Sequence, residues 1–296
     1  MSLFAHIIYL WIALRLASPD IPIMEAWNVR SRLKMLNQGM DLLKEKRYEE
    51  FTNNGYFVTS IEAIFLFDRV WNKLSRDDYG NVREITVPAH IVWVNGAPGA
   101  GKGTNTRNIM RTMGIFTRPI VVSDLLDDAG FRKKIDQGML VDDEAVTLLV
   151  FEQIFNVNSD RKSNRKSIII DGYPRTKLQV DCIQLLQMKW RKTLPIKMTS
   201  VVLLIDERTS IQRQLARGQN ALEHNKKVSQ EGVGDLIEVR STDRDPTIAR
   251  NRYKIFCDET YNALKLLKRF MDYYSIDAKG SFDEIKLRIS EALKRR

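Results

Sequence analysis

Residues 91–104 read IVWVNGAPGAGKGT, and this stretch decides the fold of the chain. Ile91–Val94 is a short run of strand-forming residues, a glycine-rich segment follows it, and a helical pattern then continues to about Met113. In a strand, loop and helix of this kind, backbone N–H groups converge on phosphate oxygens, and the positive end of the helix dipole attracts the same charge. The lysine of a G-x-x-x-x-G-K pattern then reaches the β- and γ-phosphates. The predicted phosphate-binding residues are Gly96, Ala97, Pro98, Gly99, Ala100, Gly101, Lys102, Gly103 and Thr104.

Two further segments place polar residues after apolar strands. The sequence DGYPRT, residues 171–176, follows a run of three isoleucines, and Gln179 lies three residues beyond it. Val201–Ile205 is another apolar strand, after which Arg213 and Arg217 share one helix face. Taken singly, Asp171 is also consistent with a strand-end cap, and such arginines with a solvated face. Together, the segments favour a site at the carboxyl ends of parallel strands.

The order and form of these segments resemble the adenylate kinases and the other nucleoside monophosphate kinases. The loop has the family form G-x-P-G-x-G-K-G-T, and D-G-F-P-R-T-x-x-Q is present with tyrosine in place of phenylalanine. The family segment L-V-P-D-E appears at residues 140–144 with aspartate in place of proline. Arginines at 213, 217, 240 and 252 match those that flank the family's mobile lid, with one residue inserted beside Arg240. The resemblance covers about residues 89–296.

The resemblance implies phosphoryl transfer from ATP, with Mg²⁺, to a nucleoside monophosphate, and it favours AMP. Lys102 and the loop amides would hold the donor phosphates, and Asp171 would anchor the water shell of Mg²⁺. Arg175 would hold the acceptor phosphate, and Gln179 would read the acceptor base, with Gly172 among the binding residues. The arginines implied to close over the phosphates are Arg213, Arg217, Arg240 and Arg252.

The acceptor segment departs from the family. The family sequence S-T-G-D-L-L-R aligns with residues 121–127, so its threonine becomes Val122 and its phosphate-binding arginine becomes Asp127. An acid facing an acceptor phosphate is repulsive, although Arg132 could substitute for the missing arginine if the helix is shifted. A second hypothesis therefore stays open, in which a kinase-derived subunit binds nucleotide or only retains the fold, and serves as a structural component of a larger assembly.

Alternating strands and helices predict an α/β P-loop NTPase, a three-layer sandwich with a five-stranded parallel sheet. We expect a helical N-terminal extension over residues 1–88 and the P-loop domain over 89–296, with a nucleoside-monophosphate-binding insert at 123–157 and a lid at 218–245. The lid contains no cysteine, so it is not of the zinc-bearing kind. The predicted strands lie near 91–94, 120–122, 167–170, 201–205 and 272–276.

The formal net charge is +10, and its distribution along the chain is uneven. Residues 1–88 hold 11 Lys and Arg and 11 Asp and Glu, so the later part carries 36 basic and 26 acidic residues. An excess there predicts an anionic partner. Because the basic residues are dispersed among acids and no nucleic-acid-binding signature is present, nucleotides are favoured over nucleic acid.

The N-terminal stretch Leu3–Ala17 is apolar apart from His6 and Arg15. It is shorter than the roughly 20 apolar residues that span a bilayer, and no positive side chain precedes it as in a secretory signal. We expect a helix that packs on its own protein or on a partner, which leaves open a protein assembly formed through the extension. The predicted location is intracellular, either cytoplasmic or mitochondrial.

Overall fold

The structure is a computed structural model that describes residues 60–77, 79–83, 85, 87–131, 141–157, 166–191 and 194–294. The chain divides between Ile61 and Glu62 into two units, and the described residues other than Ser60 and Ile61 belong to the second. The N-terminal stretch 3–17 lies outside the described residues, and the division at residue 88 stays a prediction. No described helix has the length and apolar character needed to cross a membrane.

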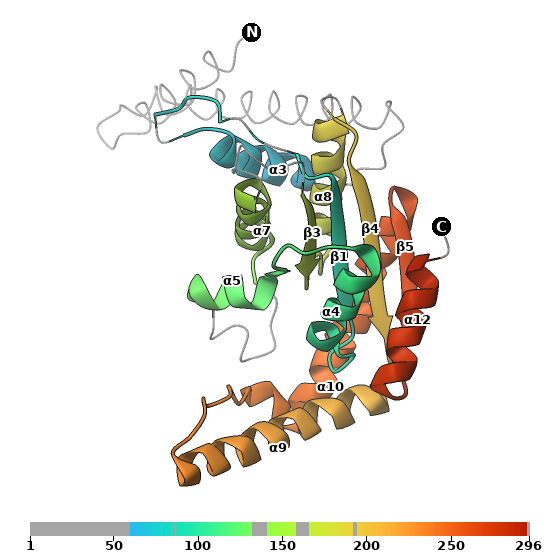
Figure 1. The fold of residues 1–296 in the computed structure, drawn as a ribbon. Coiled ribbons are helices and arrows are strands. Elements are labelled where there is room, and N and C mark those ends of the chain that lie inside the picture. The colour runs from blue at the N-terminus through green and yellow to red at the C-terminus, as the bar shows by residue number, and fades with distance from the viewer. Residues whose placement is uncertain are drawn as a thin grey trace, which may run out of the picture. The chain divides into compact units, whose positions relative to one another are not determined.

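The centre of the domain is a parallel five-stranded sheet (Figure 1). Its order is β2-β3-β1-β4-β5, so β1 lies between β3 and β4 and its carboxyl end meets segments from both sides. The predicted fold class is therefore confirmed. The strands are β1 (His90–Gly96), β2 (Ile120–Val121), β3 (Ser167–Asp171), β4 (Lys197–Leu204) and β5 (Asp272–Asp277).

Strand β4 begins four residues before the predicted start at Val201. Thr199 and Ser200 are fully buried although they are polar, because β1 pairs with them on one side and β5 on the other. The Thr199 hydroxyl lies 2.9 Å from Nε2 of His90 on β1. Pairing on both edges, which a strand pattern in the sequence does not display, therefore extends this strand.

Helices cover both faces of the sheet. Helix α4 packs beside α12, and α8 packs beside α11 on the other face (Figure 1). Helix α7 contacts both α5 and α8. The α-helices of the sandwich are α4 (Lys102–Met113), α5 (Val122–Asp128), α7 (Asp143–Val157), α8 (Lys177–Arg191), α10 (Pro246–Ile255), α11 (Asn262–Leu266) and α12 (Phe282–Lys294). Three short turns of helix complete this part: η1 (Ser241–Asp243), the π-helical η2 (Phe256–Tyr261) and η3 (Leu267–Arg269).

Helix α3 (Ile61–Leu74) is the part of the predicted extension that the structure describes as a helix. Its buried face includes Phe67 and Val70. Arg69 on its exposed side forms an ion pair with Glu144 at the start of α7, with Nη2 and Oε2 2.6 Å apart. This helix therefore packs on the domain through α7.

Helix α9 (Glu207–Glu231) is the longest described helix and leaves the sheet at the carboxyl end of β4 (Figure 1). Asp206 caps it by accepting a hydrogen bond from the Thr209 backbone N–H, which holds the Asp206 pKa at about 2. The helix runs without a break past Gly218, where the lid was predicted to begin, and ends at Gly232 in the left-handed conformation. The first part of the predicted lid is therefore a continuation of α9.

Candidate active site

The glycine loop forms a tight bridge between β1 and α4. Gly99 and Gly101 both have φ of 76°, a left-handed backbone that side chains other than glycine rarely adopt. At Gly99 a Cβ atom would also stand 2.8 Å from the carbonyl oxygen of Ser210 on α9. The loop therefore closes against α9, and α4 begins directly at Lys102.

The loop opens into a cavity of about 400 Å³ at the carboxyl ends of β1 and β3. Its described lining includes six cationic side chains and the three acidic residues Asp127, Asp171 and Glu238. Val121 and Ser123, from the acceptor segment, complete one wall. The cationic lining residues are Lys102, Arg175, Arg213, Arg217, Arg240 and Arg252.

Lys102 and Asp171 form the charged floor of this cavity. The Lys102 ammonium donates to the carbonyl oxygen of Gly96 over 3.0 Å. Burial lowers the Lys102 pKa to about 8, although the Asp171 carboxylate opposes this change. Burial likewise raises the pKa of Asp171, against the effect of Lys102 and of the Thr106 hydroxyl 3.2 Å from its Oδ2. Burial thus makes the charged form of each group less stable, so a ligand of opposite charge would favour that charged form.

Arg175 and Gln179 are placed together by the turn after β3. Arg175 Nε donates to the Gly172 carbonyl over 2.9 Å, and Arg175 lines the cavity. The Gln179 side chain is buried: its carbonyl accepts from the Arg175 backbone N–H over 2.7 Å, and its amide donates to Asp143 over 2.8 Å. Gln179 therefore supports Arg175 from behind and does not line the cavity in this conformation.

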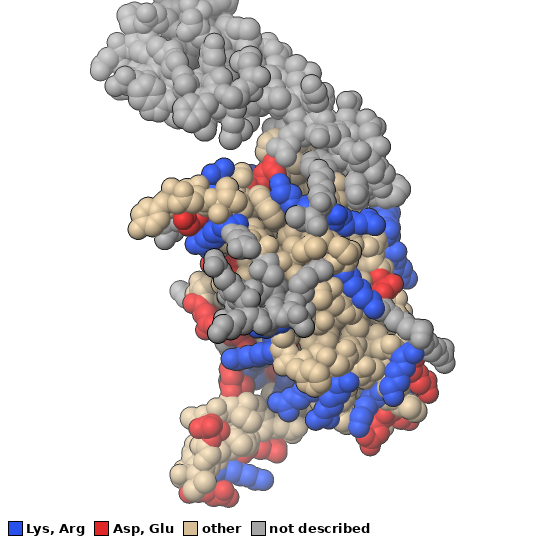
Figure 2. Space-filling model, turned by 45° about the horizontal axis from the view of Figure 1, so that its top comes forward, with Lys and Arg blue, Asp and Glu red and all other residues tan. Residues whose placement is uncertain are grey.

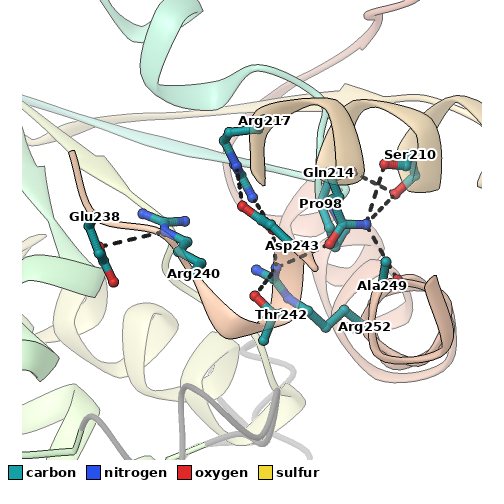
Figure 3. Close-up of polar contacts among 10 residues, drawn as sticks. All are labelled: Pro98, Ser210, Gln214, Arg217, Glu238, Arg240, Thr242, Asp243, Ala249 and Arg252. Carbon is teal, nitrogen blue, oxygen red and sulfur yellow. Dashed lines mark hydrogen bonds and ion pairs between the residues drawn. The ribbon is translucent and has the colours of Figure 1, made fainter. Parts of the chain in front are cut away.

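Three of the four predicted lid arginines are held by carboxylate or backbone carbonyl groups. Arg217 makes a two-point contact with Asp243, through Nε at 2.6 Å and Nη2 at 2.7 Å (Figure 3). Arg252 Nη1 lies 3.3 Å from the same carboxylate. Arg213 instead donates to the carbonyls of residues 278 and 280, over 2.8 and 3.0 Å. Anchoring one edge of each guanidinium fixes its direction before any ligand arrives.

Arg240 lies on the opposite wall of the same cavity, beside Glu238. Its Nε is 3.9 Å from Glu238 Oε2, in a pair whose side chains are both close to half exposed (Figure 3). Such a pair is weak in water. The structure thus brings Arg240 to the same cavity as the other predicted arginines.

The predicted residues fall into three groups. Those that line the cavity are Pro98, Gly99, Gly101, Lys102, Gly103, Thr104, Asp171, Gly172, Arg175, Arg213, Arg217, Arg240 and Arg252. Ala97 and Ala100 are buried behind the loop, and Gly96 ends β1. Arg132 lies outside the described residues. Asp127, which stands where the family has an arginine, does line the cavity.

Sequence reasoning did not assign site roles to Ser210, Gln214, Thr242 and Asp243. Asp243 is almost fully buried and joins Arg217 to Arg252. Ser210 and Gln214 are fully buried on α9 beside the loop. The only available signal was their spacing of four, which puts them on one face of the helix.

The residues present suit Mg²⁺ bound through substrate phosphates. Asp171 is the buried carboxylate at the end of β3, beside Lys102. Among the described residues, no group of three or more His, Cys, Asp or Glu could hold a metal ion by itself. Magnesium at phosphoryl-transfer sites keeps several waters and takes one or two carboxylates together with phosphate oxygens, so one such carboxylate fits this mode.

Comparisons with known proteins agree with this geometry. Residues 95–229 match a family model described as an AAA domain. An adenylate kinase of Rickettsia bellii is 28% identical over 223 residues, covering 69% of this chain and 99% of the relative. An adenylate kinase of Fervidobacterium nodosum is 27% identical over 211 residues, covering 64% of this chain and 91% of the relative. A solved gluconokinase from Sinorhizobium meliloti 1021 gives a TM-score of 0.42 at 15% identity, covering 71% of this chain and 94% of that chain.

The glycine loop with its lysine, the aspartate at the end of the neighbouring strand and the arginines around one cavity are the features expected from the sequence resemblance. The curated relatives match the chain over most of their own length. The chain is a P-loop nucleotide kinase whose sequence is similar to those of adenylate kinases.

Proposed function

We propose that the protein transfers the γ-phosphoryl group of ATP to a nucleoside monophosphate, and that AMP is the preferred acceptor. The observation that carries this proposal is the shared cavity, in which the glycine loop and the acceptor segments line one space of about 400 Å³. Phosphoryl transfer depends mostly on positioning and on stabilising charge. A space lined by six cationic side chains suits two phosphorylated ligands that meet end to end.

On the donor side, the loop N–H groups and Lys102 hold the β- and γ-phosphates of ATP. Asp171 would hold Mg²⁺ through its water shell, and the ion would supply positive charge that offsets the charge of the donor phosphates. Lys102 must be protonated to bind phosphate, and a bound polyanion raises the Lys102 pKa above about 8.

On the acceptor side, Arg175 orients the phosphate of the nucleoside monophosphate. An oxygen of that phosphate, already ionised at neutral pH, attacks the γ-phosphorus in line as the bond to the β-phosphate oxygen breaks. Two nucleoside diphosphates result, and no general base is required. The guanidinium groups of Arg217 and Arg252, which Asp243 anchors, stabilise the charge on the transferred group, and Arg240 adds positive charge from the same cavity.

Gln179 is the proposed reader of the acceptor base. Its amide offers both a donor and an acceptor, which complements N1 and the N6 amino group of adenine. Because both ends of this amide hold partners within the protein, base reading requires it to add or exchange a hydrogen bond as the acceptor enters. The names of the relatives, which are adenylate kinases, support the same choice.

Asp127 supports a second candidate function. Its carboxylate lines the cavity where the family has a phosphate-binding arginine, and repulsion there would weaken an acceptor phosphate. In this alternative the chain binds ATP but does not transfer phosphate, and it serves as a component of a larger assembly, joined through residues of the extension.

A coupled assay of the purified chain distinguishes the two. ATP is offered with AMP, UMP, CMP or GMP, and the Lys102→Met variant is the matched control. We expect turnover with AMP to exceed that with the other acceptors, and Lys102→Met to lose nearly all of it while remaining folded. Wild-type turnover in Lys102→Met would overturn the mechanism, and a preference for another acceptor would overturn AMP. ATP binding without any turnover would establish the alternative.

A further inference from the structure

A buried line of polar side chains connects the glycine loop to the arginine cluster. Ser210 and Gln214 lie one turn apart on α9, and both are fully buried. The Ser210 hydroxyl donates to the carbonyl oxygen of Pro98 in the loop over 2.7 Å. The Gln214 amide donates to that hydroxyl over 3.1 Å (Figure 3). The donor-phosphate loop and Gln214 thus share one hydrogen-bonded path.

The other end of Gln214 holds Arg252. The Gln214 carbonyl accepts from Arg252 Nη1 over 3.1 Å, and the Gln214 amide also reaches the Ala249 carbonyl on α10 over 3.3 Å. Ala249 and Arg252 belong to the same helix, so Gln214 fixes both the helix and the guanidinium that it carries. The path from Pro98 therefore ends at an arginine that lines the cavity.

This arrangement uses only one nitrogen of Arg252. Its hydrogen bonds to described residues, with Gln214, Thr242 and Asp243, all leave from Nη1. Nε and Nη2 make none within the described part of the chain, and they keep three N–H groups for a ligand. Asp243 already binds Arg217 at two points. Without Gln214, Arg252 Nη1 would keep only the Thr242 hydroxyl and the shared Asp243 carboxylate, so the direction of the guanidinium would change.

The identity of Gln214 is not explained by packing. Leucine would fill a fully buried helix position without the cost of burying an amide, which is large unless every hydrogen bond is made. The amide is satisfied here by four groups from two helices, namely the Ser210 hydroxyl and carbonyl on α9 and the Ala249 carbonyl and Arg252 guanidinium on α10. A fully satisfied buried network of this kind specifies one geometry.

We propose that Gln214 is a positioning residue for phosphoryl transfer, which holds Arg252 in register with the glycine loop through Ser210. The proposal rests on the phosphotransferase function proposed above. Gln214 contacts no substrate in it, and it acts by keeping the free edge of the Arg252 guanidinium directed at the transferred group, where a misplacement of a fraction of an ångström reduces the rate.

The test is a double-mutant cycle between Gln214→Leu and Arg252→Ala, read by single-turnover transfer from radiolabelled ATP. We expect Gln214→Leu to lower the transfer rate about 10- to 100-fold, with KM for ATP and AMP changed less than about threefold. In the Arg252→Ala background, Gln214→Leu should have almost no further effect, because the group that it positions is gone. Ser210→Ala should lower the rate in the same direction by a smaller factor.

Gln187→Leu is the matched control. Gln187 is also a buried glutamine, and it lies on α8, outside the lining of the cavity. Its amide donates to the Phe270 carbonyl over 3.2 Å. We expect its transfer rate to equal that of the wild type, and urea unfolding to show that all variants are folded. The positioning role is wrong if Gln214→Leu transfers at the wild-type rate. It is also wrong if the rate of the double variant falls by the product of the two single-variant factors. A wild-type chain without transfer to any acceptor overturns the proposed function itself, and the positioning role with it.

Discussion

The ring of Phe67 in α3 meets the ring of Phe151 in α7 edge-on, with centroids 6.3 Å apart. One turn further along both helices, Trp71 meets Phe155 in the same way at 5.7 Å. Phe151 also contacts Tyr173 of the DGYPRT segment, at 6.4 Å. A helix that precedes the glycine loop in the sequence is therefore packed, through α7, on the DGYPRT segment.

The aromatic contact of α3 is expected to be worth more than its ion pair. Phe67→Ala removes a buried ring between Trp71 and Phe151, and we expect it to lower the free energy of unfolding by about 3–5 kcal/mol. Arg69→Gln, on the same helix, breaks a pair that is largely exposed and should cost less than about 1 kcal/mol. Urea titration of both variants checks this, and equal losses would contradict it.

Shortening the chain tests which part of the N-terminal region the kinase needs. A chain that begins at Thr59 keeps α3, so we expect it to stay soluble and to retain phosphotransfer. A chain that begins at Arg76 exposes Phe151 and Phe155 on α7 and should aggregate or unfold. Light scattering and the coupled assay measure both properties. An active full chain that loses its activity on deletion of residues 1–58 alone would contradict this prediction.

The lowered pKa of Lys102 predicts proton uptake when ATP binds. With a pKa of about 8, the Lys102 amine is half protonated at pH 8, and bound phosphate restores its full positive charge. Binding at pH 8 should therefore take up about half a proton, and at pH 6.5 almost none from this group. Calorimetry in buffers of different ionisation enthalpy measures the uptake. Arginine stays charged at both pH values, so Lys102→Arg should abolish the difference in proton uptake between pH 8 and pH 6.5. If that difference persists in Lys102→Arg, the proton binds to another group.

Gly218 on α9 permits the close approach of Asp243. A Cβ atom at this position would overlap the backbone carbonyl of Asp243, so Gly218→Ala must displace the turn that binds Arg217. Alanine normally stabilises a helix relative to glycine by about 1 kcal/mol, yet here we expect a loss of about 1–3 kcal/mol and at least a tenfold lower turnover. Gln219→Ala, at the exposed neighbouring position, is the control. A Gly218→Ala variant that is both more stable and fully active would refute the role of this contact.

Sequence patterns predicted the centre of the sheet because β1 and β3 are each an apolar run followed by a chemically distinctive turn. Ile91–Val94 before the glycine loop and Ile168–Ile170 before Asp171 both became central strands. The start of β4 was missed because Thr199 and Ser200 look like loop residues, and only pairing on both sides buries them. The bounds of the lid stay a prediction, and the continuation of α9 past Gly218 was not predictable because glycine disfavours a helix interior, whereas here it permits contact with Asp243.

The cavity residues were predictable where local geometry dictates their chemistry, as at Lys102 and Asp171. Ser210 and Gln214 were not, because polar residues on a helix usually face solvent. Their partners Pro98 and Arg252 lie 112 and 38 residues away, so burial arises only from the tertiary fold. The contact of Gln179 with Asp143 spans 36 residues and was hidden in the same way.

The cationic lining of the cavity also bears on how long the protein survives in a cell. Six like charges around one space repel each other, and the acids beside them offset only part of that repulsion. A nucleotide supplies the missing counter-charge and binds only the native form, so it shifts the unfolding equilibrium in proportion to its concentration. The ligand-free molecule is then the form most exposed to proteases, and the abundance of the protein should follow the nucleotide supply of its surroundings.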